Sequence, residues 1–256
     1  MFHVEHLCEK TLRYIFMRMR RKKHLDTRMA ACADYLVAEP EQYKGIWREV
    51  FALCKARRPH HAENLPDPMP RDDVGIVPYE LYLEIGCGKG KFIREKSRVD
   101  GNAYFLAMEK VTNVIVAAME TAKAEDIQNV KFLNEDAENL TDYFADGELD
   151  GIYLNFSDPW RKRDQYHRRL TYKTFLDAYR RILKPGAFVE FKTDNRDLFD
   201  FSVKSFRDNG YEIVRLRYDL HNSEFAPGNI MTEYEINFSG KGFTINYLRV
   251  VPVPPM

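Results

Sequence analysis

From residue 82 onward, short apolar runs alternate with amphipathic stretches of helical period. The apolar runs predict strands at residues 82–85, 104–108, 130–134, 151–156 and 188–193. The stretches between them predict helices at residues 91–98, 113–125, 171–183 and 195–208. Two later apolar runs, 211–218 and 243–251, complete the pattern. Regular alternation of strand and helix favours an α/β fold, with a mostly parallel sheet covered by helices on both faces.

The pattern divides the chain into three parts. Residues 1–55 are predicted to be a basic, helical N-terminal extension, and near its end apolar side chains recur at helical spacing: Tyr43, Ile46, Trp47, Val50 and Phe51. Residues 56–79 carry Pro66, Pro68 and Pro70, which suit neither a helix interior nor a central strand, so this part is predicted to be a linker or surface loop. Residues 80–256 form the predicted α/β domain.

Composition and charge exclude several classes of protein. The 39 Lys and Arg residues balance 39 Asp and Glu residues, so no overall basic field indicates a nucleic-acid partner. The four cysteines, Cys8, Cys32, Cys54 and Cys87, form no CxxC pair, which predicts reduced thiols and no metal site. The chain has no apolar run of bilayer length, and its acidic start does not resemble a signal peptide. We therefore expect a cytoplasmic protein without membrane contact.

Positive charge is concentrated locally instead. One basic run covers residues 18–23, and a second group follows residue 160: Arg161, Lys162, Arg163, Arg168, Arg169, Lys173, Arg180 and Arg181. Such side chains contact nucleic-acid phosphates and supply affinity without reading sequence. Most basic runs are simply solvated faces of helices. If these contact RNA, substituting Arg168 and Arg169 should weaken RNA binding and leave cofactor binding unchanged.

The first predicted strand ends in a glycine-rich turn, Leu-Glu-Ile-Gly-Cys-Gly-Lys-Gly at residues 83–90. Gly86, Gly88 and Gly90 permit a sharp turn and a close approach of a ligand to the backbone. Their GxGxG spacing differs from the GxGxxG of dinucleotide sites, and Glu84 lies just before the turn. In parallel sheets, ligands bind at this edge, where strands end and their order reverses.

Two further acids follow the next strands. Glu109 ends the second strand, where a carboxylate can accept both hydroxyls of a ribose. Asp136 lies just past the third strand, where it could accept from an adenine amino group or only cap the following turn. Together with Glu84, these acids disfavour a ligand that carries phosphates. They suit a cationic nucleoside.

These motifs resemble those of class I S-adenosylmethionine-dependent methyltransferases. More narrowly, the glycine turn, Asn-Phe-Ser-Asp-Pro-Trp at residues 155–160, the basic stretch 161–172, Lys-Thr-Asp-Asn at 192–195 and Thr-Glu-Tyr-Glu at 232–235 resemble the bacterial tRNA (guanine-N7-)-methyltransferase family. The resemblance covers residue 80 to the end and extends to parts of the N-terminal region. It implies a Rossmann-like fold with a seven-stranded sheet, S-adenosyl-L-methionine as cofactor, and methylation of tRNA at guanine N7, at position 46.

The resemblance also implies roles for individual residues. Cofactor contacts fall to Glu84, Gly86, Gly88, Gly90, Glu109, Asp136 and Asp158, and Asp158 serves in catalysis as well. Contacts to the target nucleoside or its RNA fall to Lys162, Asp194, Thr232, Glu233, Tyr234 and Glu235. The chain departs from the family pattern after Trp160, where Arg161 replaces a proline and Asp164 and Gln165 replace Arg and His. We expect a monomer or a homodimer.

The chemistry of the implied acceptor is simple. Guanine N7 has an in-plane lone pair and no proton, so its methylation needs no general base. The enzyme must instead place N7 in line with the donated methyl group. Asp158 or Asp194 could accept from guanine N1–H and N2–H and could stabilise the cationic product ring. We therefore expect Asp158 to orient the guanine rather than to remove a proton.

Several alternatives stay open at this point. Thr232 with Glu235 matches a helix capping box, and Asp194 with Asn195 could cap the next helix. Within the fold, Asp158-Pro159-Trp160 is similar to the Asp-Pro-Pro-Tyr of amino-group methyltransferases but lacks the second proline. A third possibility is an RNA-binding scaffold that binds the cofactor without catalysis. Trp160 at a strand end is unusual, since a large aromatic ring there needs a pocket or a ligand.

Overall fold

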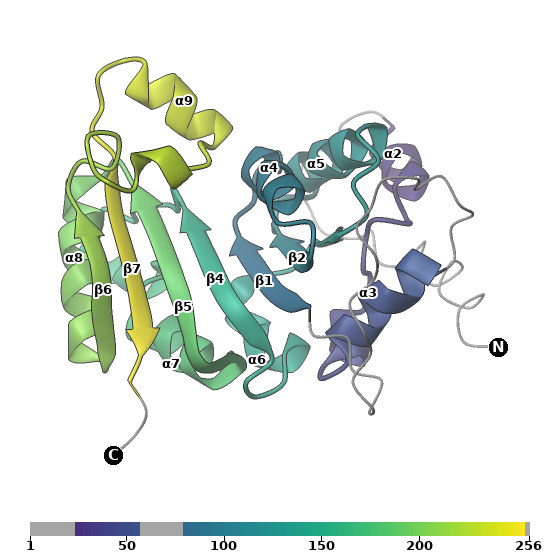
Figure 1. The fold of residues 1–256 in the computed structure, drawn as a ribbon, viewed down its shortest axis with the longest axis horizontal. Helices are drawn as coiled ribbons and strands as arrows, with labels where there is room; N and C mark the ends of the chain where they lie inside the picture. Colours follow the sequence, from purple (N-terminus) through teal and green to yellow (C-terminus); the bar gives the residue numbers. More distant parts are fainter. Residues whose placement is uncertain (1–23, 57–78, 254–256) are drawn as a thin grey trace.

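The computed structural model describes residues 24–56 and 79–253 (Figure 1). Its centre is one seven-stranded sheet in the order β3-β2-β1-β4-β5-β7-β6. The strands are β1 (Glu80–Ile85), β2 (Ala103–Met108), β3 (Val130–Leu133), β4 (Leu149–Asn155), β5 (Leu183–Thr193), β6 (Tyr211–Arg217) and β7 (Asn246–Pro252). β1 to β5 pair in parallel, and β7 pairs antiparallel with both β5 and β6. The prediction of a mostly parallel sheet is confirmed.

Helices cover both faces of this sheet, and each face has its own hydrophobic core. One face is covered by α2 (Leu25–Ala31), α4 (Lys91–Val99) and α5 (Thr112–Ala124). The other is covered by α3 (Trp47–Ala56), α6 (Leu140–Tyr143), α7 (Lys173–Ile182) and α8 (Arg196–Asp208). The last helix, α9 (Glu233–Ser239), lies beyond the strand ends toward which the arrows of β4 and β5 point (Figure 1). Short 3-10 turns occur at Pro40–Tyr43, Ala137–Asn139, Arg163–Arg168 and Ala226–Gly228.

Strand β1 shows how the sequence pattern builds the two cores. Leu81, Leu83 and Ile85 pack into the core beside α7, whereas Tyr82 packs into the core beside α4 and α5. Alternate residues of a strand point to opposite faces, so Glu84 follows Tyr82 onto the α4 side. A carboxylate therefore occupies a position that an apolar side chain would ordinarily fill.

The described part of the N-terminal region packs against the sheet. Trp47 is fully buried and donates from Nε1 to the carbonyl of Tyr143 at 2.9 Å. Phe51 stacks on Tyr104 of β2 with ring centroids 4.5 Å apart. Leu36 forms a parallel bridge with Phe132 at the outer edge of β3. The basic run 18–23 and most of the predicted linker lie outside the described residues.

The predicted elements match the observed ones apart from some boundaries and two short helices, and the predicted strand 188–193 begins earlier, at Leu183. The apolar run 243–251 predicted a strand from Phe243, but β7 begins at Asn246, and Phe243 is 50% exposed. The predicted helix 171–183 ends at Ile182 because β5 begins at Leu183. α6 and α9 were not predicted as helices, although the capping box of α9 was noted as a signal.

Other expectations can be compared with the described ranges. Cys32 and Cys87 are free, buried thiols, and the side chains of Cys8 and Cys54 lie outside those that the structure describes. Across residues 24–56 and 79–253, no group of His, Cys, Asp and Glu side chains could hold a metal ion. None of the helices in these ranges is long and apolar enough to cross a membrane.

Candidate active site

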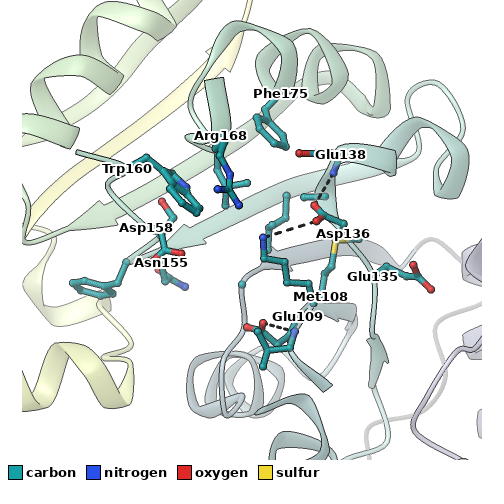
Figure 2. Close-up of a pocket in the computed structure, with 18 residues that line it drawn as sticks. Met108, Glu109, Glu135, Asp136, Glu138, Asn155, Asp158, Trp160, Arg168 and Phe175 are labelled. Carbon is teal, nitrogen blue, oxygen red and sulfur yellow. Dashed lines mark hydrogen bonds and ion pairs between the residues drawn. The ribbon is translucent and has the colours of Figure 1, made fainter. Parts of the chain in front are cut away.

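A cavity of about 260 Å³ lies at the carboxyl ends of the central strands. β1 lies between β2 and β4, so strand order reverses here, as it does at the ligand sites of open α/β sheets. The residues that line the cavity include Gly86, Glu109, Asp136, Asn155, Asp158 and Trp160. In Figure 2, Asp158 and Trp160 lie across the cavity from Glu109 and Asp136.

The glycine turn after β1 needs glycine for its backbone conformation. Gly86 has a φ of 78° and Gly88 a φ of 57°, in the left-handed region that side chains disfavour. A Cβ atom at either position would meet no other atom within 4 Å. The turn thus exposes bare backbone beside the cavity. Gly90, by contrast, begins α4 at close quarters, since its Cβ would lie 3.0 Å from that of Ala118.

Glu84 is buried beneath this turn with half of its carboxylate unpartnered. Only 2% of the residue is exposed, and Asn155 donates from Nδ2 to Oε1 at 2.9 Å. Oε2 is buried and accepts no hydrogen bond from the described residues, although the backbone N–H of Ile93 is close enough to the carboxylate to lower its pKa. Burial raises the pKa of Glu84 to about 7, opposed by the Asn155 hydrogen bond and the positive charge of Lys192. The Glu84 carboxylate can therefore accept a hydrogen bond from a positively charged donor group.

Glu109 and Asp136 line the cavity from the ends of β2 and β3. Glu109 accepts from the backbone N–H of Val111 at 2.9 Å and, more weakly, from that of Gly88 at 3.3 Å. Asp136 accepts from the N–H of Glu138 at 3.2 Å, so it does cap the next turn. Each carboxylate oxygen can accept more than one hydrogen bond, so both groups retain capacity for a ligand.

The loop after β4 presents Asp158 to the cavity. The loop is strained at both ends, because Phe156 and Trp160 have φ values of 54° and 39°, unusual for residues with side chains. Asp158 is exposed, and its carboxylate forms no hydrogen bond or ion pair within the part of the chain that the structure describes. The guanidinium of Arg168 lies 3.7 Å from the Trp160 ring centroid, as a cation–π contact. Trp160 thus has both a cavity and a cation as neighbours.

Arg169 supports this loop from beneath. It is 3% exposed, and it donates from Nε to the Pro159 carbonyl at 2.9 Å and from Nη2 to the Trp160 carbonyl at 3.3 Å. Its guanidinium lies 3.7 Å from the Tyr166 ring centroid and 4.4 Å from that of Phe201. The prediction that Arg169 contacts RNA phosphates beside Arg168 is therefore wrong. Neighbouring arginines in a basic run can point in opposite directions, and only Arg168 is exposed.

A second buried cation supports α9. Lys192 of β5 and Glu235 of α9 form an ion pair at 2.8 Å, and their side chains are 1% and 0% exposed. Lys192 also donates to Asn229 Oδ1 and to the Ile230 carbonyl, each at 2.9 Å. Glu235 accepts from Asn229 Nδ2 at 2.6 Å and lies 2.8 Å from His221 Nε2. Burial alone would raise the pKa of Glu235, but Lys192 and these hydrogen bonds outweigh it and lower the pKa.

The N-terminus of α9 carries the buried Glu235 of this pair together with solvent-exposed residues. Thr232 Oγ1 accepts from the N–H of Glu235 at 2.9 Å, and Glu235 reaches back to the N–H of Thr232, which confirms the capping box. Tyr234 donates to Asp194 Oδ2 at 3.3 Å, while Asn195, not Asp194, caps α8. Glu233 is exposed and pairs with Lys89 at 3.0 Å. Of these four residues of α9 and its cap, Glu235 is the one inside the protein.

The structure brings some predicted residues together and leaves others apart. Gly86, Glu109, Asp136 and Asp158 line one cavity, and Glu84 lies behind it through Asn155. Asp194, Lys162 and the Thr232–Glu235 run are not part of its wall, and Lys162 is exposed at the start of a 3-10 turn. Sequence reasoning missed Asn155 and Lys192. Lys192 leaves one signal, a charged residue at a position that strand alternation should bury.

Known proteins resemble this chain in sequence and in fold. Residues 79–248 match a family model described as "Putative methyltransferase". The chain is 38% identical over 239 residues to a tRNA (guanine-N(7)-)-methyltransferase of Geobacillus sp. (strain WCH70), covering 93% of this chain and 97% of that protein. Among solved structures, the 16S rRNA methyltransferase KamB aligns with a TM-score of 0.52 and 14% identity, covering 73% of this chain and 96% of that one. That last similarity concerns the fold alone.

Proposed function

We propose that this chain, which belongs to the tRNA (guanine-N7-)-methyltransferase family, methylates guanine N7 in tRNA with S-adenosyl-L-methionine as methyl donor. The observation that carries the proposal is the placement of Asp158. Its exposed carboxylate, without a partner among the described residues, lies across one cavity from Glu109 and Asp136, with Glu84 buried behind it, at the point where strand order reverses. One wall suits a cationic nucleoside, and the other suits a base that presents hydrogen-bond donors.

The residues of the cofactor wall fit S-adenosyl-L-methionine, which supplies an electrophilic methyl group on a sulfonium when it is bound. Glu84 Oε2 is a buried acceptor that needs a donor, and an ammonium group is the donor that best suits a carboxylate. Glu109 is placed to accept from ribose hydroxyls and Asp136 from an adenine amino group. The bare backbone at Gly86 and Gly88 allows close approach.

On the opposite wall, Asp158 orients the acceptor. A carboxylate accepts hydrogen bonds from the N1–H and N2–H of guanine, which fixes the direction of the N7 lone pair. No proton leaves N7, so Asp158 has none to remove. Because the guanine ring becomes cationic as it gains the methyl group, the nearby negative charge also stabilises the transition state. Asp158 thus acts by position and charge.

Arg169 and Lys192 act through other residues and are positioning residues. Arg169 fixes the carbonyls of Pro159 and Trp160, which hold Asp158 in its loop. Lys192 fixes Glu235, and through it the start of α9, where Thr232, Tyr234 and Glu233 are presented to the substrate. Glu235 therefore contributes by holding α9 rather than by touching RNA.

The exposed cations beside the cavity bind the RNA backbone in this proposal. Arg161, Lys162, Arg163 and Arg168 are exposed on the loop and 3-10 turn that follow Asp158. They would contact phosphates around the target nucleotide, with a salt-dependent contribution to affinity. We place the target at position 46 of the variable loop on the family resemblance alone. We further propose that the protein works in the cytoplasm, as a monomer or homodimer.

The test is methyl transfer from labelled cofactor to bulk tRNA that lacks the modification, followed by nuclease digestion and mapping of the modified nucleoside. The expected product is N7-methylguanosine at one position. N6-methyladenosine would point to an amino-group methyltransferase instead. Cofactor binding without methyl transfer would support the non-catalytic scaffold and contradict the proposal.

A further inference from the structure

A row of aromatic rings leads from the cavity to the surface of α9. Phe156 and Tyr234 have ring centroids 5.0 Å apart, and Tyr234 stacks on Phe238 at 4.0 Å with the planes 13° from parallel. Phe238 then meets Phe243 edge-on at 5.4 Å. We call these four rings the aromatic row. Its outer members are open to solvent, since Tyr234 is 40% and Phe243 50% exposed.

The inner end of the row belongs to the active site. Phe156 lines the cavity and immediately follows β4 in the loop that carries Asp158. Tyr234 reaches Asp194 at the end of β5 through its hydroxyl group. The exposed rings are therefore continuous with the place where the target guanine must sit. In Figure 1, α9 correspondingly lies over the strand ends that surround this site.

Positive charge flanks the row. Lys241 Nζ lies 5.1 Å from the Phe238 ring centroid, and within the described ranges it has no carboxylate partner. Lys89 extends from the glycine turn to α9, but the exposed Glu233 balances its charge there, so of these two lysines Lys241 is the one left to contact a phosphate. Exposed aromatic rings beside cations are the combination that binds single-stranded nucleic acid, where rings stack on bases and cations meet phosphates.

We propose that the aromatic row is a stacking surface for the nucleotide next to the target guanine; this inference rests on the proposed function. When a guanine is drawn into the cavity, its neighbour loses a stacking partner, and an aromatic ring can replace that partner. Phe243 is the exposed end of the row and the ring that meets this base. Specificity for sequence is not expected from it, because every base has a face that stacks.

A second copy of this chain is the main competing occupant. A stable dimer buries about 800 Å² on each partner, a much larger area than a few half-exposed rings around a seven-residue helix provide. The row adjoins the cavity, which contributes nothing to contacts between two copies of the chain. The same position places an RNA base stacked on the row beside the target guanine. The observations therefore favour RNA.

The experiment compares three variants of the full chain. Phe243→Ala removes the outer ring, Phe243→Trp enlarges it, and Ile236→Ala removes an exposed aliphatic side chain of α9 outside the row. For each variant, we would measure the dissociation constant for unmodified tRNA at one fixed salt concentration and the dissociation constant for the cofactor. The unfolding temperature of each variant shows whether it folds. We expect Phe243→Ala to weaken tRNA binding roughly 5- to 150-fold, as for loss of one stacked base. Phe243→Trp and Ile236→Ala should bind like wild type or better.

Unchanged tRNA affinity in folded Phe243→Ala overturns the inference, as does an equal loss in Ile236→Ala, which would indicate an unspecific apolar contact. A wild-type dimer that Phe243→Ala dissociates, with tRNA affinity per subunit unchanged, assigns the row to a second copy. If Phe243→Ala fails to fold, the test uses wild-type protein and tRNA that carries a fluorescent purine analogue beside the target guanine. Stacking of the analogue on the aromatic row must change its fluorescence emission, and unchanged emission overturns the inference. The product of the wild-type reaction separates the two proposals. If no N7-methylguanosine forms, the proposed function is wrong, and if it forms, a failed binding test overturns only the role of the aromatic row.

Discussion

Glu84 and Glu235 are both buried carboxylates beside the active site, yet their surroundings differ. Glu235 on the α9 side has a buried cation, Lys192, and further hydrogen bonds that lower its pKa. Glu84 on the cofactor side has only Asn155 at one oxygen, and its pKa is raised to about 7. A carboxylate with all its partners inside the protein holds structure together. One that lacks a partner is prepared for a charged ligand.

The same contrast separates the two walls of the cavity. On the proposed cofactor wall, strand ends and a glycine turn place Glu84, Glu109 and Asp136 directly, through the backbone of the sheet. On the substrate wall, a strained loop and a short helix are held by the buried cations Arg169 and Lys192. We infer that the substrate wall depends on specific side chains for its shape, whereas the cofactor wall depends on the fold.

Breaking the buried pair should have the largest effect. Lys192→Met leaves Glu235 charged and buried without its cation, so the free energy of unfolding should fall by about 3–5 kcal/mol. Urea denaturation measures it. In the matched double variant, Lys192→Met with Glu235→Gln, the uncompensated charge is gone, and much of the stability should return. A loss below about 1 kcal/mol in the single variant would show that the pair does not hold α9.

Removing the exposed acid should affect the reaction and spare the fold. Asp158→Ala deletes the acceptor that we propose orients guanine, and the methyl-transfer rate should drop by roughly 10²–10³-fold, as for loss of a transition-state contact. The free energy of unfolding should change little because Asp158 is exposed. Asp164→Ala, an exposed carboxylate on the following 3-10 turn, is the control and should keep its rate. Similar losses in both variants would argue against a specific role for Asp158.

The unpartnered acid should make cofactor binding depend on pH. Glu84 loses its proton near pH 7, and only the ionised form attracts a cationic ligand. The cofactor dissociation constant should therefore rise on the order of tenfold as pH falls from about 7.5 to 5.5. Calorimetry at several pH values measures it. In Glu84→Gln the constant should be higher and nearly independent of pH, and a wild-type constant equally flat would contradict the assignment.

The stability of the cofactor-free protein should shift in the opposite sense. The folded pKa of about 7 exceeds the ordinary value of 4.5, so Glu84 keeps a proton that the unfolded chain has already lost between these pH values. Its contribution to stability is thus fully present below pH 4.5 and is lost as pH rises through 7. Denaturation curves of wild type and Glu84→Gln should diverge over this interval.

The smallest effect should come from Arg168. Arg168→Ala removes an exposed cation proposed to contact an RNA phosphate, worth about 0.5–1 kcal/mol, so tRNA binding should weaken roughly two- to fivefold. The salt dependence of binding should decrease by about one ion. Arg169→Ala should instead lower the free energy of unfolding, because two carbonyl oxygens lose their donor. Equal behaviour of the two variants would contradict the difference in their burial.

Much of the fold could be predicted because the strands are buried on both faces and flanked by clear turn signals. β1 to β4 and the helices α4, α5, α7 and α8 follow the apolar pattern closely, whereas β5 begins at Leu183 instead of residue 188. The pattern failed at Phe243, because periodicity cannot distinguish an exposed aromatic ring from the first residue of a strand. It also missed the short helices α6 and α9, which are held by tertiary contacts.

The site was predictable where chemistry follows the backbone. Carboxylates at strand ends must meet at one edge of a parallel sheet, and Glu109 and Asp136 do. The positioning residues were not predictable in this way. Lys192 and its partner Glu235 are 43 positions apart, so no local pattern joins them. Arg169 was grouped with its exposed neighbours, because a count of charges does not say which side chain turns inward.

The most direct test of the central claim, that Asp158 orients guanine without removing a proton, is the single-turnover rate of methyl transfer as a function of pH. Cofactor and unmodified tRNA are kept saturating, so that titration of Glu84 in the free protein does not enter. The rate should stay level from about pH 6 to 9, because no essential base titrates in that range. A rate that increases about tenfold per pH unit up to a plateau near neutrality would reveal such a base and contradict the account.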